Sequence, residues 1–358
     1  MLSRNRTRRL LSQCQFTRSH SDHGPLRLLF FGRDEFSCRT FKELYKARDV
    51  WESIDIVTTP DGRIGRGLGQ ISRSPLSIIG QDLDVPCHVI PKEREGRTAW
   101  LPPPPFSSPT FNHVIISASY GRAITSDVLS LFDHRLNVHP SLIPKYRGPS
   151  PIQTAIANGD LETGVSVINM EDVSQGFDTG DVHAIEKVNI PEGATYNSLV
   201  PLLAQKGGEV LVDVLRNLTK GVITRTPQDH SQATKTRMIR QAAGNVDWNK
   251  SAYHIERLHR AYGHQRPLVT SFIPNSQKPD APKALFLSDL SVASFPLPPS
   301  LQHLGDCTYL SEIGRTLVLC GEGTGLLVGT VKREGKRSMP SGEWWKGIKG
   351  DVTRLGLA

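Results

Sequence analysis

Short apolar runs separated by helical patterns are the feature that most constrains the fold of the first half of this chain. The runs Leu28–Phe31, Ile54–Thr59, Cys87–Ile90 and His113–Tyr120 are each typical of a buried strand, and a helical pattern from Glu35 to about Lys46 follows the first. Strands that alternate with helices favour a parallel sheet with buried strands. We therefore expect a Rossmann-like, mostly parallel α/β sheet flanked by helices.

Local signals place several helix ends. Ser74-Pro75 and Ser150-Pro151 each put a capping residue before a proline, whose missing N–H is tolerated in the first helical turn. Asn158-Gly159 is expected to end the second of these helices. A longer helical segment, Thr195–Leu218, is expected to close the first domain and to be broken near Gly207-Gly208.

The remainder of the chain predicts a linker and a smaller second domain. Residues 92–109 include four consecutive prolines and form an irregular insertion, and Lys220–Met238 is polar without periodicity, as an interdomain linker would be. A helical segment, Ser251–Tyr262, precedes short strand-like runs at Leu268–Ile273, Ala284–Leu287, Thr316–Cys320 and Gly325–Val331. Such runs are typical of a small β-barrel, here expected to be OB-like. The expected domains are residues 26–219, a linker at 220–240, and the barrel at 241–358.

The formal net charge of +8 is concentrated at the end of the chain. Residues 220–358 hold 19 Lys and Arg against 11 Asp and Glu, whereas residues 26–219 hold 19 against 23. A basic surface binds polyanions because its side chains displace the counterions condensed on phosphates. The last third therefore favours a nucleic-acid partner, with a basic surface kept for solubility as the alternative.

The first 25 residues have the composition of an organelle transit peptide. They contain five arginines interleaved with leucine and phenylalanine, and Asp22 is their one acidic residue. A secretory signal would need an uninterrupted apolar stretch instead. We expect import into the mitochondrial matrix, and the alternative is a basic arm that touches RNA directly.

Cysteine usage and hydropathy exclude several classes of protein. Five cysteines are widely spaced without a CxxC pair, so a disulfide framework or a thiolate zinc site is not expected. No stretch approaches the ~18 continuous apolar residues of a membrane-spanning helix. The twelve histidines show no metal-ligand spacing. We expect neither a membrane span nor a bound metal.

Asn137, His139 and Asp178 are the candidate catalytic residues. Residues two apart in a strand point to the same face, so Asn137 and His139 project together before Pro140 ends the ladder. Polar side chains at the carboxyl end of a strand lie where α/β sheets bind ligands. An amide and an imidazole aimed at one oxygen would stabilise an oxyanion, and Asp178 would orient the imidazole and favour its charged form. The alternative is that Asn137 and His139 bond only to loop backbone and that Asp178 only forms a turn.

Other catalytic motifs are missing from the sequence. No G-x-S-x-G nucleophile elbow is present, and no cysteine is evidently placed beside a histidine. The turn Gly32–Glu35 lacks the glycines of a dinucleotide fingerprint, and Gly65–Gly69 is not followed by the G-K-[ST] of a phosphate-binding loop. Nucleophilic, dinucleotide and phosphate-loop chemistry are therefore not expected, while the three candidates by their own chemistry suit acyl transfer to an amine without a covalent intermediate.

The sequence around the candidate residues resembles the folate-dependent formyltransferases. The likeness lies in NVHPSLIPKYRGPSPIQ (137–153), GDLETGVSVINM (159–170) and GFDTGD (176–181). Within that family the chain most resembles the members that formylate methionyl-tRNA, through TTPDGRIGRG (58–67), GNVDWNKSAYHIERLHRAYG (244–263) and GEGTGLLVGTVKREGKRSM (321–339).

The resemblance implies roles for individual residues. Asn137, His139 and Asp178 match the catalytic residues of the family. Its folate-binding segments correspond to Ser119, Tyr120, Gly121, Ser141, Leu142, Ile143 and Pro144. The candidates for tRNA contact are Arg63 and Arg66 in the basic loop, and Lys332, Arg333, Lys336 and Arg337 in the barrel.

The implied reaction is transfer of a formyl group from 10-formyltetrahydrofolate to the α-amino group of initiator methionyl-tRNA. The resemblance implies no metal and no membrane, and we expect a monomer. Two alternatives stay open. One is a formyltransferase acting on a small amine, or a hydrolase of formyl-folate. The other is a non-catalytic relative that binds tRNA.

Overall fold

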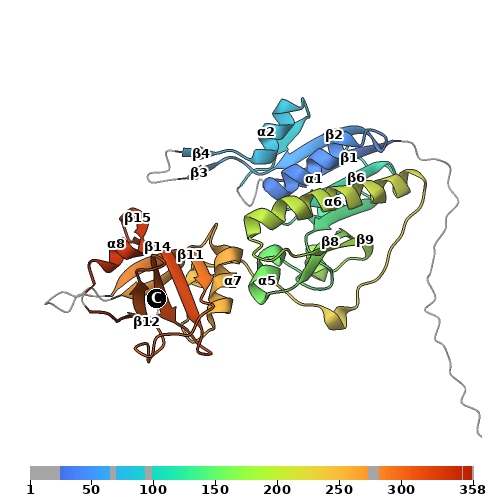
Figure 1. Ribbon diagram of the computed structural model, residues 1–358. Helices are drawn as coiled ribbons and strands as arrows, with labels where there is room; N and C mark the ends of the chain where they lie inside the picture. Colours follow the sequence, from blue (N-terminus) through green and yellow to red (C-terminus); the bar gives the residue numbers. More distant parts are fainter. Residues whose placement is uncertain (1–24, 65–69, 93–98, 273–281, 349, 357–358) are drawn as a thin grey trace, which may run out of the picture.

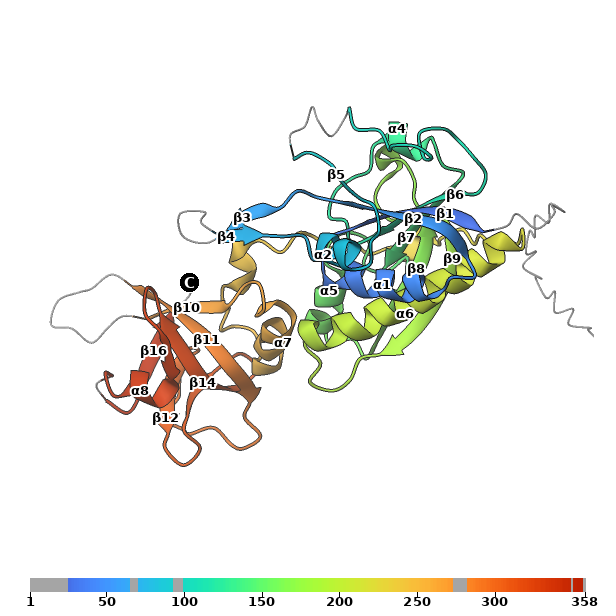
Figure 2. The ribbon, with the colours of Figure 1, turned by 90° about the horizontal axis from the view of Figure 1, so that it is seen from above.

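The computed structural model describes residues 25–64, 70–92, 99–272, 282–348 and 350–356 (Figure 1). It consists of a sheet domain and a barrel domain that lie beside each other (Figure 2). No helix within these residues is both long and apolar enough to cross a membrane.

The sheet domain is built on seven strands in the order β5-β2-β1-β6-β7-β8-β9. Their bounds are β1 Leu26–Gly32, β2 Trp51–Thr58, β5 Cys87–Val89, β6 His113–Ala118, β7 His134–His139, β8 Glu162–Asn169 and β9 Val182–Asn189. The first five in chain order run parallel, and β8 and β9 continue the sheet antiparallel. The prediction of a mostly parallel sheet is confirmed, but β8 and β9 were not anticipated.

Helices cover both faces of this sheet. Their bounds are α1 Glu35–Lys46, α2 Pro75–Asp82, α4 Ser126–Leu129, α5 Pro151–Asn158 and α6 Tyr196–Thr219. Alternate residues of β1 point to opposite faces, so Leu28 and Phe30 join the core under α1 and α6, while Leu29 and Phe31 join a second core. Phe106, from the proline-rich insertion, is fully buried in that second core. The described part of the insertion therefore covers a face of the sheet.

Two of the expected helix starts differ from prediction in their chemistry. Ser74 and Ser150 occupy the N-cap positions of α2 and α5, but neither side chain caps its helix. The Ser74 hydroxyl instead forms a hydrogen bond with the Thr58 hydroxyl, and the Ser150 hydroxyl donates to the Arg237 carbonyl. Gly159 ends α5 in the left-handed conformation, as predicted.

The expected break near Gly207-Gly208 is wrong, because α6 runs without interruption from Tyr196 to Thr219. The two glycines are points of close packing. A Cβ at Gly207 would lie 2.7 Å from Val138 Cγ1, and one at Gly208 would lie 2.6 Å from Glu43 Cβ. The absence of these side chains lets α6 approach both the sheet and α1.

We expect Gly207→Ala to lower the free energy of unfolding by about 1–3 kcal/mol. Overpacking against Val138 outweighs the gain of about 1 kcal/mol in helix propensity that alanine normally brings. Urea denaturation of the purified protein measures the difference. Asn217→Ala, at an exposed position of the same helix, is the control and should be neutral or slightly stabilising. A Gly207→Ala protein as stable as the parent would contradict this packing.

The second domain is a closed antiparallel barrel, as predicted. Its strands are β10 Leu268–Phe272, β11 Lys283–Val292, β12 Asp306–Leu310, β13 Arg315–Leu319, β14 Gly325–Arg333, β15 Ser338–Pro340 and β16 Thr353–Gly356. The order β11-β10-β16-β12-β13-β14 closes through pairing of β11 with β14, and β15 is added to β14. The helix α7, Ala252–Tyr262, and the short α8, Ser341–Trp345, complete the domain.

The helix α7 also joins the two domains. Arg257 Nε donates to the Ala157 carbonyl at 3.2 Å, and Arg260 Nη1 donates to the Ala194 carbonyl at 2.7 Å. The rings of Tyr196 and His264 stack with their centroids 3.9 Å apart and their planes within 2°. The barrel is therefore held against the sheet domain by specific hydrogen bonds and by a ring contact.

A last element of the sheet domain is a hairpin made of β3, Gly62–Ile64, and β4, Gln70–Ser72. It extends from the sheet on the side where the barrel lies (Figure 1). The same relation is visible from above (Figure 2).

Candidate active site

The three candidate catalytic residues meet at one end of the sheet. Asn137 and His139 end β7, and Asp178 lies in the turn between β8 and β9. Asn137 Nδ2 donates to Asp178 Oδ1 at 3.1 Å, and His139 Nδ1 lies 3.7 Å from Asp178 Oδ2. The side chains of His139 and Asp178 are 6% and 14% exposed, so their electrostatic interaction is little screened by solvent. The structure thus brings all three side chains together.

The orientation of His139 has a different cause from the one expected. Its Nε2 lies 3.0 Å from the carbonyl oxygen of Tyr146. A carbonyl only accepts, so Nε2 carries a hydrogen and Nδ1 is the nitrogen turned toward Asp178. The 3.7 Å between Nδ1 and Asp178 Oδ2 is too long for a hydrogen bond. Tyr146 therefore orients the ring, and Asp178 acts on it through charge.

Asp178 is held tightly although it lies in a turn. Its Oδ2 accepts from the backbone N–H of Gly148 at 2.8 Å, and its backbone has φ 58°, in the left-handed region. That conformation is uncommon for a residue with a side chain and persists where the surroundings impose it. A Cβ at Gly180 would lie 2.2 Å from the Asn169 carbonyl oxygen, so this turn needs glycine to approach β8.

The expected folate-binding segments lie beside this group, but several of their side chains are committed to the protein. Ser141 is fully buried and donates to the Lys145 carbonyl at 2.7 Å, while Ile143 packs with Ile168 and Val182. Leu142 and Pro144 are half-buried. This segment can offer a ligand mainly its backbone and these two apolar side chains.

The second segment, Ser119–Gly121, follows β6 at the carboxyl edge of the sheet. Ser119 has φ 50° and donates from Oγ to Asp34 Oδ2 at 2.5 Å. Burial raises the pKa of Asp34, while this bond opposes the shift. The Tyr120 ring belongs to the core, 5.2 Å from the ring of Phe31. Gly121, with φ 77°, has open space where a Cβ would be.

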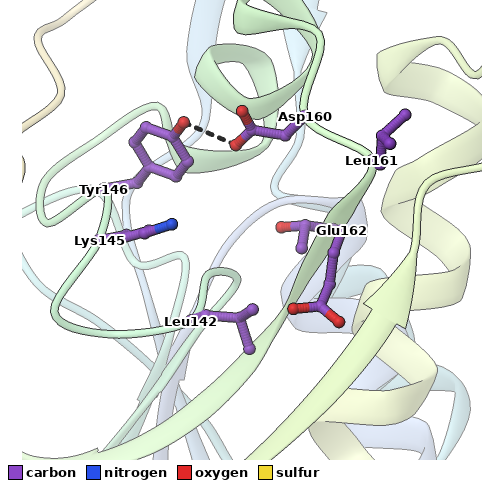
Figure 3. A pocket seen from close by; sticks show the side chains of 7 residues that line it. Leu142, Lys145, Tyr146, Asp160, Leu161 and Glu162 are labelled. Carbon is purple, nitrogen blue, oxygen red and sulfur yellow. Dashed lines mark hydrogen bonds between the residues drawn. The ribbon is translucent and has the colours of Figure 1, made fainter.

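A cavity of about 280 Å³ lies next to the Ser141–Pro144 turn. It is lined by Leu142, Lys145, Tyr146, Asp160, Leu161, Glu162 and Thr163. Figure 3 shows the Tyr146 hydroxyl pointing at Asp160, to which it donates at 2.6 Å. None of the three candidate catalytic residues lines this cavity, but Tyr146 connects it to His139 through its carbonyl.

The expected tRNA contacts divide into two groups. Lys332 and Arg333 end β14, and Lys336 and Arg337 lie in the turn before β15; all four are exposed on the barrel. Arg66 lies outside the described residues. Arg63 belongs to β3 by its backbone, and its side chain is not among those described. Within the described chain, no group of three or more His, Cys, Asp or Glu side chains is arranged to hold a metal ion.

Two residues near the site were missed in the sequence. Arg147 and Gln228 are 6% and 8% exposed and bond to each other beside Asp178. A buried arginine needs a partner, but the partner lies 81 residues away in a polar segment without periodicity. Arg147 could have been noticed from the sequence because it lies inside the segment 137–153 that carries the resemblance, whereas nothing around Gln228 marks it.

Comparisons with known proteins match both domains. The formyl transferase family model matches residues 109–215, and the model of the formyl transferase C-terminal domain matches residues 238–349. The methionyl-tRNA formyltransferase of Roseiflexus sp. (strain RS-1) is 31% identical over 330 residues, covering 91% of this chain and 93% of the relative. That of Marinobacter nauticus is 34% identical over 244 residues, covering 66% and 73%.

Solved structures support the fold at lower identity. WlaRD, a sugar 3N-formyl transferase determined with dTDP and 5-N-formyl-THF, has a TM-score of 0.59 and 15% identity, with 87% of this chain and 99% of that chain covered. HypX from Aquifex aeolicus in complex with tetrahydrofolic acid has a TM-score of 0.54 and 18% identity, with 91% and 48% covered.

Proposed function

Because this chain belongs to the methionyl-tRNA formyltransferase family, we propose that it transfers the formyl group of 10-formyltetrahydrofolate to the α-amino group of initiator methionyl-tRNA. It is a formyl-transferring enzyme, and the family uses a folate donor. The observation that carries the proposal is the convergence of Asn137, His139 and Asp178 at the carboxyl edge of the sheet.

The reaction begins with attack by the unprotonated amine on the formyl carbon. Free α-amino groups titrate near ~7.7–8.0, so a usable fraction is unprotonated at neutral or slightly alkaline pH. Attack forms the new C–N bond and places negative charge on the formyl oxygen. Asn137 Nδ2 uses one hydrogen on Asp178, which leaves its second hydrogen for that oxygen.

His139 supplies the second interaction with the formyl oxygen and takes part in proton transfer. In the charged imidazole, Nδ1–H faces Asp178 at a separation too long for a direct bond, so this hydrogen is available to the substrate. Asp178 stabilises the imidazolium. A proton from the attacking ammonium then reaches the departing folate nitrogen through this pair as the old C–N bond breaks.

The basic barrel supports a tRNA substrate over a small amine. Lys332, Arg333, Lys336 and Arg337 form an exposed cluster that a small substrate would not need. The test is a formylation assay with protein lacking its first ~25 residues. We expect charged initiator tRNA to be formylated faster than charged elongator tRNA, and free small amines to be inert. Formylation of a small amine with no tRNA activity would favour the alternative.

We expect Arg66→Ala to raise the apparent KM for methionyl-tRNA about tenfold, the effect of losing one charged hydrogen bond. The KM for the folate donor should not change. Steady-state formylation at varied concentrations of each substrate gives both values. The control is Arg216→Ala, which removes an exposed arginine of α6 that forms an ion pair with Asp49. Equal weakening toward both substrates would remove the basic loop from this role.

The site of action is proposed from the first residues alone. Five arginines and one acid in residues 1–25 support import into the mitochondrial matrix, where the product would serve initiation of translation. A fluorescent reporter carrying these residues should enter mitochondria. A reporter that stays outside them would contradict the proposal. We also propose that the enzyme acts as a monomer, which sedimentation would test.

A further inference from the structure

Residues 224–237, which we call the strap, cross the candidate active site on their way from the sheet domain to the barrel. Thr226 forms an antiparallel bridge with Val182, the first residue of β9. Further along, the Arg147 N–H donates to the Thr234 carbonyl at 2.9 Å, and the Thr236 N–H donates to the Arg147 carbonyl at 2.7 Å. The strap is therefore hydrogen-bonded to Arg147, which precedes Asp178 in the sequence, and to Val182, which follows it.

Gln228 is the strap residue that reaches the catalytic turn. Its Nε2 donates to the Asp178 carbonyl at 3.0 Å and to the Gly180 carbonyl at 2.6 Å. Gln228 is 8% exposed, so these bonds are shielded from water. They hold the Asp178 carbonyl and the turn that follows it, and so support the left-handed conformation of Asp178.

Arg147 in turn holds Gln228. Its Nε and Nη2 donate to Gln228 Oε1 at 3.0 and 2.5 Å, and Nη2 also donates to His230 Nδ1 at 2.9 Å. Burial lowers the pKa of Arg147, and the charge of Asp178 acts in the opposite direction. Because both the oxygen and the nitrogen of the Gln228 amide are hydrogen-bonded, the side chain has one fixed orientation.

We propose that Gln228 is a positioning residue, which holds Asp178 at the distance from Asn137 and His139 that formyl transfer requires, and that Arg147 orients it. This inference rests on the proposed function. It also makes the segment that leads to the barrel part of the catalytic machinery. Displacement of a catalytic group by about 1 Å can cost 100-fold in rate. Removing the hydrogen bonds of Gln228 is therefore expected to lower kcat.

The test compares three variants of the full-length protein. Gln228→Ala removes both carbonyl contacts. Gln228→Glu keeps the side-chain length and the acceptor for Arg147 but removes the N–H donors, which separates donation from packing. Gln232→Ala is the matched control, because its amide donates to Asp229 within the strap and not to the catalytic turn in the described structure. Each protein is measured for kcat, for KM of both substrates and for thermal unfolding.

We expect kcat to fall about 10- to 100-fold in both Gln228 variants, with each KM within about twofold of the parent. In Gln228→Glu, a new ion pair with Arg147 offsets the repulsion between the carboxylate and the two carbonyl oxygens, so this variant should fold and decides the matter if Gln228→Ala folds poorly. Parental kcat in a folded Gln228→Glu protein overturns the positioning role while the proposed function stands. A parent without formyl transfer contradicts the proposed function itself.

Discussion

Replacing Asn137 with alanine is expected to lower kcat by about 10²- to 10³-fold, the usual cost of losing one hydrogen-bond donor to an oxyanion. The amide lies at the end of β7 and is fixed by its bond to Asp178 Oδ1 at 3.1 Å. It does its work as charge develops on the formyl oxygen, so affinity for the folate donor should change little. Single-turnover formylation with saturating donor, together with donor binding by calorimetry, separates the two effects.

The control for this variant is Asn189→Ala. Asn189 also ends a strand, β9, but is exposed at the edge of the sheet. We expect its kcat to equal that of the parent. Near-normal turnover in a folded Asn137→Ala protein would mean that oxyanion stabilisation comes from elsewhere.

Asp178→Asn is expected to reduce kcat by about 10²- to 10⁴-fold, the range for losing a group that takes part in proton transfer. The substitution keeps the shape of the side chain but removes the charge that faces His139 Nδ1 at 3.7 Å. It also brings an amide N–H against either the Gly148 N–H or Asn137 Nδ2, both of which donate to Asp178. Rates measured across pH, with circular dichroism to verify folding, provide the test.

Asp172→Asn serves as the control for charge in the same β8–β9 connection. Asp172 caps a short 3₁₀ turn through the Ser174 N–H at 2.8 Å and also accepts from the Ser126 hydroxyl, whereas Asp178 is the carboxylate that faces His139. We expect it to retain nearly full turnover. If the two variants lose activity equally, the loss reflects the stability of the connection and not the charge of Asp178.

The sequence was informative where local geometry decides the arrangement. Asn137 and His139 must project to one side because they are two apart in a strand, and their place at the carboxyl edge follows from the parallel sheet. Asp178 was proposed as the partner of His139 and was then matched by the resemblance, but neither its distance from β7 nor its positive φ follows from local spacing. The orientation of His139 by the Tyr146 carbonyl was missed because a backbone acceptor leaves no pattern in the sequence.

The errors share a physical cause in contacts between distant parts of the chain. Gly207 and Gly208 were predicted to break the helix because glycine has a low helix propensity. In the structure they allow α6 to approach Val138 and Glu43. The strap was predicted to be a polar linker because its contacts are hydrogen bonds between Gln228, Thr234 and Thr236 and residues about 50 to 90 positions earlier. Hydrophobic periodicity carries no information about such bonds.

The strand β9 was missed for a related reason. It is the edge strand of the sheet, and Ile185, Glu186 and Lys187 are exposed in succession, so the alternation of buried and exposed residues is lost. Its partner β8 is buried on both faces over most of its length, which also removes the alternation.

A crystal structure of the enzyme with folinic acid would test the central claim most directly. The account predicts the pterin between Ser119–Gly121 and Ser141–Pro144, with Asn137, His139 and Asp178 facing the side of the ligand from which the formyl group is transferred, within about 3–4 Å. A ligand bound away from these segments, with the three side chains out of its reach, would contradict the mechanism.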